Sequence, residues 1–152
     1  MKKINLAISG CMGRMGQQLI KSSKKNKKFK LVTLTENRSV NKKFAGIKPE
    51  HNSENAFKKI DVIIDFTVPD CTLEILKIAS KLKKSVVIGT TGFNRTQENK
   101  IKKFAGRIPV LKAGNMSLGV NLLMYLTEIA SKSLNDEYLS KIFEVHLSLI
   151  HI

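Results

Sequence analysis

The chain has 152 residues, of which 42% are hydrophobic, and a formal net charge of +15. This is enough apolar material for one good core and favours a single main domain. No apolar run approaches the roughly 20 residues that span a bilayer, and the run after the first lysines is too short for a signal peptide, so we expect a cytoplasmic protein with no membrane partner. Cys11 and Cys71 lack metal-ligand spacing and suit a reducing compartment, so we expect both to be structural and predict no metal site.

A strand, a glycine loop, a helix and a second strand are predicted in the first part of the chain. The first strand covers residues 4–9, and glycines follow at positions 10, 13 and 16. A second apolar run at residues 31–35 is followed directly by Glu36, which lies 20 positions after Gly16. This order and spacing predict a dinucleotide-binding βαβ unit.

The residue types in this unit suit the binding of a dinucleotide. Glycines let the backbone turn tightly, bring N–H groups close to a pyrophosphate and pack the helix closely on the strand. The positive end of the helix dipole favours the same phosphates, and Glu36 can accept hydrogen bonds from the ribose hydroxyls. Three glycines alone also occur in turns that bind nothing, but the full order of elements favours a binding site. The spacing Gly-x-x-Gly-x-x-Gly indicates a variant of the usual motif.

A cluster of lysines between residues 21 and 30 makes nucleic-acid binding an alternative. The rest of the composition argues against it, because few of the 27 basic residues are arginines and no aromatic residues interleave with the lysines to stack on bases. We therefore expect no nucleic-acid partner. Most lysines are predicted to lie on solvated helix faces, where their field would attract anions.

Strands and helices alternate after a polar stretch at residues 37–55. The apolar patterns predict strands at residues 61–65, 85–88 and 108–111, and helices at residues 69–83 and 94–104. This alternation predicts an α/β fold, a Rossmann-like doubly wound parallel sheet.

Small and hydroxyl residues fill the three loops that follow these strands, at residues 65–67, 89–92 and 113–117. Ligands of such sheets bind beyond the carboxyl ends of the strands, so three such loops at one edge favour a site. The alternative for each loop is ordinary helix capping. The capping candidates are Thr67 or Asp70 for one helix, Thr91 or Asn94 for the next, and Ser117 for the last.

Four strings of residues together resemble one family. They are Gly-Cys-Met-Gly-Arg-Met-Gly at 10–16, Asp-Phe-Thr at 65–67, Val-Ile-Gly-Thr-Thr-Gly-Phe at 87–93 and Asn-Met-Ser-Leu-Gly-Val-Asn at 115–121. In their order and spacing they are similar to the 4-hydroxy-tetrahydrodipicolinate reductases (dihydrodipicolinate reductases) of lysine and diaminopimelate biosynthesis. The resemblance implies an oxidoreductase that passes a hydride from NADH or NADPH to a cyclic dicarboxylate, giving tetrahydrodipicolinate.

The resemblance also implies which residues hold the cofactor. Residues 10–15 would hold the pyrophosphate, Glu36 the adenine ribose and residues 89–91 the nicotinamide end, while residues 113–116 would close over the nicotinamide. Thr91 would also lie near a substrate carboxylate. The complete set is Gly10, Cys11, Met12, Gly13, Arg14, Met15, Glu36, Arg38, Phe66, Gly89, Thr90, Thr91, Ala113, Gly114, Asn115 and Met116.

The position after the ribose-binding acid bears on the choice of cofactor. The family often has arginine there, where it can pair with a 2′-phosphate, whereas this chain has Asn37 followed by Arg38. We therefore favour NADH, or use of both cofactors.

The C-terminal part departs from the family. A helix is predicted at residues 119–134 and a strand at 141–145, and His146 stands at the position of the family's first catalytic histidine. Leu147 and Ile150 stand where the family has a second histidine and a lysine. We expect a dinucleotide-binding domain at residues 1–118 and, at 119–152, only the beginning of a second, α+β substrate domain.

This departure bears on activity and assembly. By the resemblance, His146 would stabilise or protonate the substrate as the hydride arrives; alternatively, it is a strand-end histidine without a role. We expect this chain to bind cofactor without turnover, and no homotetramer like that of the family. Two other classes remain as alternatives, another Rossmann-type oxidoreductase and a non-catalytic dinucleotide-binding module.

Overall fold

The computed structural model describes residues 2–134, 138–139, 141 and 143. The chain divides into two compact units, Met1–Gly114 and Asn115–Ile152, and each has its own architecture. Among the described helices, none is long and apolar enough to cross a membrane.

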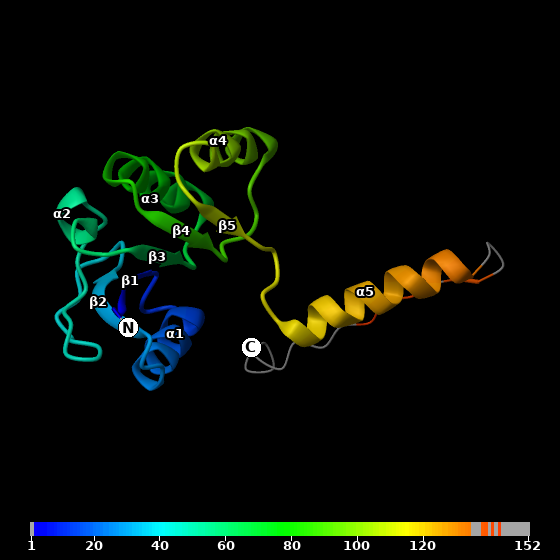
Figure 1. Cartoon of the computed structure of the whole chain (residues 1–152), viewed down its shortest axis with the longest axis horizontal. Coiled ribbons are helices and arrows are strands. Elements are labelled where there is room, and N and C mark those ends of the chain that lie inside the picture. The colour runs from blue at the N-terminus through cyan, green and yellow to red at the C-terminus, as the bar shows by residue number, and fades with distance from the viewer. Residues whose placement is uncertain (1, 135–137, 140, 142, 144–152) are drawn as a thin grey trace. The chain divides into compact units, whose positions relative to one another are not determined.

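The first unit is built on a parallel sheet of five strands in the order β2-β1-β3-β4-β5 (Figure 1). The chain runs from β1 to β2 on one side and then crosses to β3 on the other side of β1, so the order of the strands reverses between β1 and β3. The predicted α/β parallel sheet is therefore confirmed. The strands are β1 (Ile4–Ser9), β2 (Phe29–Thr35), β3 (Val62–Asp65), β4 (Ser85–Ile88) and β5 (Val110–Lys112).

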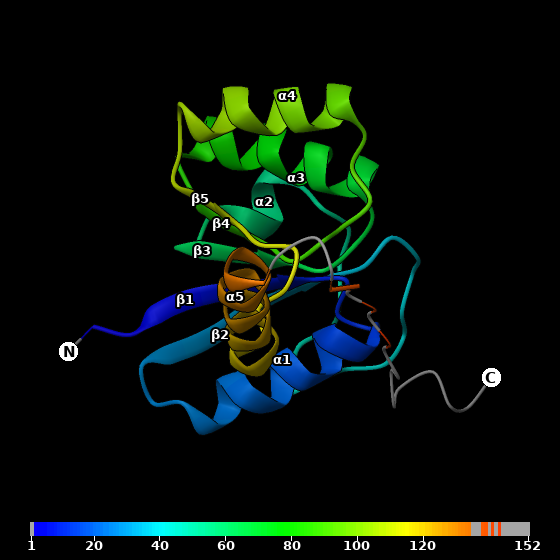
Figure 2. The ribbon, with the colours of Figure 1, turned by 90° about the vertical axis from the view of Figure 1, so that its right-hand side faces the viewer.

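Helices cover both faces of this sheet. Figure 2 shows α1 (Arg14–Lys25) on one face and α3 (Pro69–Leu82) with α4 (Arg95–Ala105) on the other. Successive residues of a strand point to opposite faces, so Ala7 and Ile8 of β1 belong to different hydrophobic clusters, and both are fully buried. The lysines between residues 21 and 30 are exposed, as predicted.

Two strands begin two residues away from their predicted starts, and one helix was not predicted. The strand β2 begins at Phe29 and not at residue 31, and β5 begins at Val110 and not at residue 108. The Ile108 N–H donates to the Phe104 carbonyl at 3.1 Å, so this residue still belongs to the turn that ends α4. In the polar stretch, a one-turn helix α2 (Glu54–Phe57) is capped by the Ser53 hydroxyl, which accepts from the Ala56 N–H at 3.0 Å.

The second unit contains the helix α5 (Leu118–Ser133). Ser117 caps it, in agreement with the capping alternative for this loop, because its hydroxyl accepts from the Val120 N–H at 3.4 Å. The Asn121 amide donates to the carbonyls of Asn115 (3.1 Å) and Ser117 (2.8 Å), so the polar residues of this motif bond to one another around the helix start. The strand predicted at residues 141–145 lies largely outside the described residues.

Candidate functional site

The glycine loop folds tightly between β1 and α1. Gly10 has a φ of +75°, and a Cβ atom there would lie 2.4 Å from the Phe66 carbonyl oxygen. A Cβ at position 16 would lie 2.2 Å from the Gly10 carbonyl oxygen. Only glycine fits these two positions without rearrangement, which supports the tight turn and the close helix packing expected from the sequence.

Most N–H groups in the first half of this loop are engaged within the protein. Those of Gly10 and Cys11 donate to the Thr35 carbonyl at 3.0 and 3.3 Å, and that of Gly13 donates to the Gly10 carbonyl at 3.1 Å. The helix α1 begins directly afterwards, and its first turn carries no acidic residue. An anion is therefore best placed at this helix start, where the dipole is positive.

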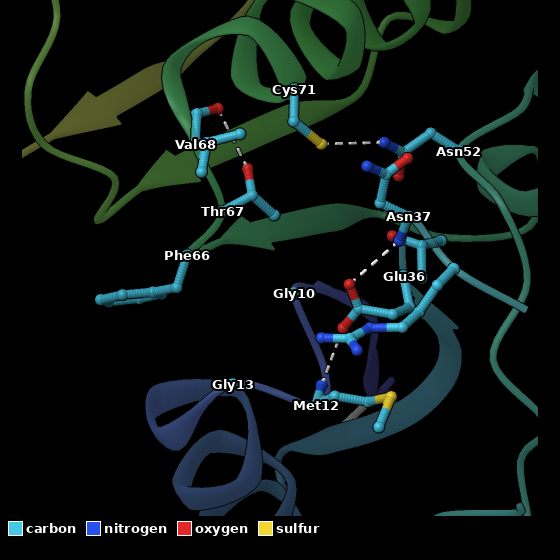
Figure 3. A pocket seen from close by; sticks show the side chains of 12 residues that line it. Gly10, Met12, Gly13, Glu36, Asn37, Asn52, Phe66, Thr67, Val68 and Cys71 are labelled. Carbon is cyan, nitrogen blue, oxygen red and sulfur yellow. Dashed lines mark hydrogen bonds between the residues drawn. The ribbon is translucent and has the colours of Figure 1, made fainter. Parts of the chain in front are cut away.

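The Glu36 carboxylate lies at the end of β2 and reaches the glycine loop. One oxygen accepts from the Met12 N–H at 3.1 Å and the other from the Asn37 N–H at 3.0 Å, as Figure 3 shows. The carboxylate faces a pocket of about 620 Å³, which Gly13 and Arg38 also line. The acid, the glycine loop and the helix start that the sequence predicted therefore lie around one cavity.

A second pocket of about 300 Å³ adjoins the first at the carboxyl ends of β3 and β4. Both pockets are lined by Gly13 and Phe66, so together they form one elongated hollow. The Phe66 ring lies directly over Gly89, because a Cβ atom there would come within 2.2 Å of the ring. The other predicted cofactor residues in this second pocket are Arg14, Met15, Thr90 and Thr91.

A buried carboxylate that the sequence reasoning missed lies beneath this hollow. Asp65, at the end of β3, is 0% exposed and accepts hydrogen bonds from the hydroxyls of Thr67 (2.6 Å), Thr90 (3.2 Å) and Thr72. Burial raises the pKa of this carboxyl above its ordinary value, and the three hydroxyl groups act in the opposite direction. The available signal was an acid that ends an apolar strand and is followed by hydroxyl residues.

The two cysteines lie in different surroundings. Cys11 is fully buried against α1 and β2, and burial together with the Glu36 carboxylate raises the pKa of its thiol to about 11, so the thiol stays protonated. Its side chain therefore packs in the core, as expected of a structural cysteine. Cys71 lines the larger pocket and accepts a hydrogen bond from the Asn52 amide at 3.2 Å. Burial is the main cause that raises the pKa of the Cys71 thiol.

Three predicted cofactor residues of the first unit, Cys11, Ala113 and Gly114, do not line either pocket. The Ala113 N–H donates to the Ile88 carbonyl at 3.3 Å, next to the end of β4, and Gly114 ends the first unit. Asn115 and Met116 belong to the second unit. His146 lies outside the described residues.

The fold and this site define a class of protein. A parallel sheet, a glycine loop that leads into a helix, an acid at the end of β2 and a hollow where the strand order reverses make a Rossmann-like dinucleotide-binding domain.

The particular family follows from comparison with known proteins. The profile described as "Dihydrodipicolinate reductase, N-terminus" matches residues 4–116. The chain belongs to this family, and the resemblance noted in the sequence is confirmed.

Relatives with the name 4-hydroxy-tetrahydrodipicolinate reductase support this assignment. The protein from Pelagibacter ubique (strain HTCC1062) is 78% identical over 146 residues, which are 96% of this chain and 57% of that protein. The protein from Wolbachia pipientis subsp. Culex pipiens (strain wPip) is 35% identical over 159 residues, covering 97% of this chain and 60% of that protein. The chain therefore spans less than two thirds of the length of these relatives.

Solved structures agree on the fold. A dipicolinate-bound dihydrodipicolinate reductase from Paenisporosarcina sp. TG-14 superposes with a TM-score of 0.72 at 24% identity, covering 86% of this chain and 54% of that one. An aspartate semialdehyde dehydrogenase II from Vibrio cholerae gives a TM-score of 0.63 at 18% identity, covering 86% of this chain and 43% of that one. Likeness at this level of identity concerns the fold alone.

Proposed function

We propose that this chain binds NADH or NADPH in the elongated hollow, and that the whole enzyme reduces 4-hydroxy-tetrahydrodipicolinate to tetrahydrodipicolinate in lysine and diaminopimelate biosynthesis. The observation that carries the proposal is the position of the Glu36 carboxylate, which faces the larger pocket across from the start of α1. A dinucleotide needs both a carboxylate for a ribose and a positive site for its phosphates. The family membership supports the reaction.

The lining residues suggest how the cofactor lies. Glu36 would accept from the adenine ribose hydroxyls, and the pyrophosphate would lie over Gly13 at the start of α1. The smaller pocket, with Phe66 over Gly89, would hold the nicotinamide. The reduced nicotinamide, when bound, supplies the hydride. Thr91, which is exposed in this pocket, is then suitably placed for a substrate carboxylate.

The ribose end favours NADH or the use of both cofactors. A 2′-phosphate would lie beside the Glu36 carboxylate and be repelled by it, whereas Arg38 lines the same pocket and can offset part of that repulsion. The variant Glu36→Gln removes the negative charge with little change of shape. We expect it to bind NADH more weakly and to raise the affinity for NADPH relative to NADH; an unchanged ratio of the two dissociation constants would contradict this assignment.

The chemistry of reduction is proposed for the whole enzyme. His146 would stabilise or protonate the substrate as the hydride arrives. Leu147 and Ile150 stand where the resemblance places a second histidine and a lysine, so the family's substrate-neutralising groups are not supplied at these positions. We therefore expect this 152-residue chain to bind the cofactor without turning over the substrate.

A titration tests the proposal directly. The purified chain is titrated with NADH and with NADPH, following nicotinamide fluorescence, in the presence and absence of pyridine-2,6-dicarboxylate. We expect micromolar binding that does not change with the dicarboxylate, since Leu147 and Ile150 stand where the resemblance places groups that act on the substrate. Absence of binding of both cofactors would overturn the proposed function.

A further inference from the structure

The Asp65 carboxylate joins three segments of the chain. Its Oδ1 accepts from Thr67 in the loop after β3, and its Oδ2 accepts from Thr72 on α3 and from Thr90 in the loop after β4. The Thr90 hydroxyl also accepts from the Thr67 N–H at 2.9 Å. The loops after β3 and β4 are therefore tied to each other through one hydroxyl and one carboxylate.

This connection sets the wall of the smaller pocket. In the sequence, Phe66 lies between Asp65 and Thr67, and Gly89 directly precedes Thr90. Phe66 and Gly89, which are in contact in the pocket wall, are therefore sequence neighbours of the residues that these hydrogen bonds join. Asp65 and Thr90 are 0% and 4% exposed. The Asp65 side chain cannot touch a ligand, and its effect on the pocket must pass through the loops.

We propose that Asp65 is a positioning residue for the nicotinamide half of the cofactor, holding the Phe66 ring and the backbone of residues 89–91 in place through Thr67 and Thr90. The inference rests on the proposed cofactor function and adds to it a residue that does not contact the cofactor.

The choice of a carboxylate at this position supports a positioning role. Burying an ionised carboxyl group costs several kcal/mol, and an apolar residue at the end of a central strand would avoid that cost. A carboxylate offers several lone pairs and accepts bonds from three directions at once, which an apolar side chain or a single hydroxyl cannot do. Such a group can therefore determine the geometry of the loops that donate hydrogen bonds to it.

Two ligands that differ only in the nicotinamide ring separate positioning from general stability. ADP-ribose has the adenosine, the pyrophosphate and the second ribose of NADH but no nicotinamide. The full chain and the variant Asp65→Ala are titrated with both ligands by calorimetry. Loss of hydrogen bonds to a charged group predicts that the variant binds NADH about tenfold more weakly, with ADP-ribose affinity changed by about twofold at most.

Two further variants serve as matched comparisons. Asp65→Asn keeps an oxygen that can accept from both Thr72 and Thr90, so it should restore most of the NADH affinity. Thr72→Val removes the buried hydroxyl bond from α3 to the same carboxylate and a longer bond to the Val68 carbonyl (3.3 Å), but it leaves the bonds of Asp65 to Thr67 and Thr90 in place, so it should keep the NADH affinity within about twofold. If Asp65→Ala does not fold, Asp65→Ser, whose single hydroxyl cannot accept from all three threonines, breaks the same connection and should show the same selective loss.

The outcomes distinguish the inference from the function on which it rests. If the unaltered chain binds neither ligand, the proposed function fails and the inference fails with it. If it binds both but Asp65→Ala, or Asp65→Ser in its place, retains its NADH affinity or loses both ligands equally, only the positioning role is overturned. Selective loss of NADH, with recovery in Asp65→Asn, supports it.

Discussion

At the scale of single residues, the contact between Phe66 and Gly89 leaves the least room for change. The ring lies so close to the Gly89 backbone that a Cβ atom would overlap three of its carbons. Gly89→Ala must therefore displace the ring from the pocket wall. We expect a loss of about 1–3 kcal/mol in the free energy of unfolding from overpacking, and weaker NADH binding. Urea denaturation and NADH titration measure the two effects.

Gly106→Ala is the matched comparison for this change. Gly106 has a negative φ, and the nearest atom to an added Cβ would be 3.6 Å away, which is ordinary contact. This variant should bind NADH like the unaltered chain. An equal effect of the two substitutions would mean that the ring contact is not what matters at position 89.

The buried Asp65 carboxyl makes stability depend on pH in a defined direction. Its pKa is raised in the folded chain, mainly by burial, so ionisation costs more in the folded than in the unfolded state. The contribution of Asp65 to stability is therefore complete below its ordinary pKa of 3.8 and is lost as the pH rises through the folded value.

Asp65→Asn isolates this effect, because every other titrating group is shared by the two proteins. We expect the free energy of unfolding of the unaltered chain, minus that of Asp65→Asn, to fall as the pH rises above about 4 and through the raised folded-state pKa of Asp65. Urea titrations at a series of pH values provide the measurement. A difference that stays constant, or grows with pH, would show that burial does not dominate.

At the scale of elements, the start of α4 depends on a reciprocal pair of side chains. The Asn94 side chain accepts from the Gln97 N–H at 2.9 Å, and the Gln97 side chain accepts from the Asn94 N–H at 3.0 Å. Asn94→Ala should lower the free energy of unfolding by about 1 kcal/mol, since it leaves a helix N–H without its cap. Thermal unfolding measures this loss.

Asn99 offers the same substitution within the same helix. It is exposed in the middle of α4, where alanine is the better helix former, so Asn99→Ala should leave stability equal or slightly higher. If the two variants were equally destabilised, the loss at position 94 could not be assigned to the cap.

Elements with a strong local signal could be predicted from the sequence. Apolar runs gave β1, β3 and β4 within a residue or two, and the motif from Gly10 to Glu36 located the larger pocket. The helix α2 was missed because one turn is too short to show a period, and its cap at Ser53 lies in a polar stretch.

The interior of the site was less accessible to sequence reasoning. The bonds of Asp65 join residues 67, 72 and 90, and the contact of Phe66 with Gly89 joins two loops. Such contacts exist only once the strands β3 and β4 lie side by side. Local patterns identified the loops and their hydroxyl residues but not which acid would hold them together.

At the scale of the whole molecule, the two units differ in what they bury. The first unit contains the sheet, both hydrophobic clusters and both pockets. The helix α5 of the second unit has no buried residue. Leu122, Leu126 and Ile129 recur at helical spacing on it and are between 45% and 54% exposed. An apolar stripe of this kind favours association between copies of the chain.

We therefore expect the full chain to self-associate as its concentration rises, and a fragment of residues 1–114 to remain monomeric while still binding ADP-ribose. Sedimentation velocity at increasing concentration measures the association. The double variant Leu122→Lys, Leu126→Lys should reduce it, because each lysine would have to be desolvated in the contact between copies.

Thr127→Lys, Ser131→Lys is the control for this last experiment. It adds the same charge to α5 with the same spacing but away from the stripe, so it reports the effect of net charge alone. Association that is lost only in the leucine variant would assign it to the stripe. Equal loss in both would assign it to charge, and a full chain that stays monomeric would show that these exposed side chains do not bring copies together.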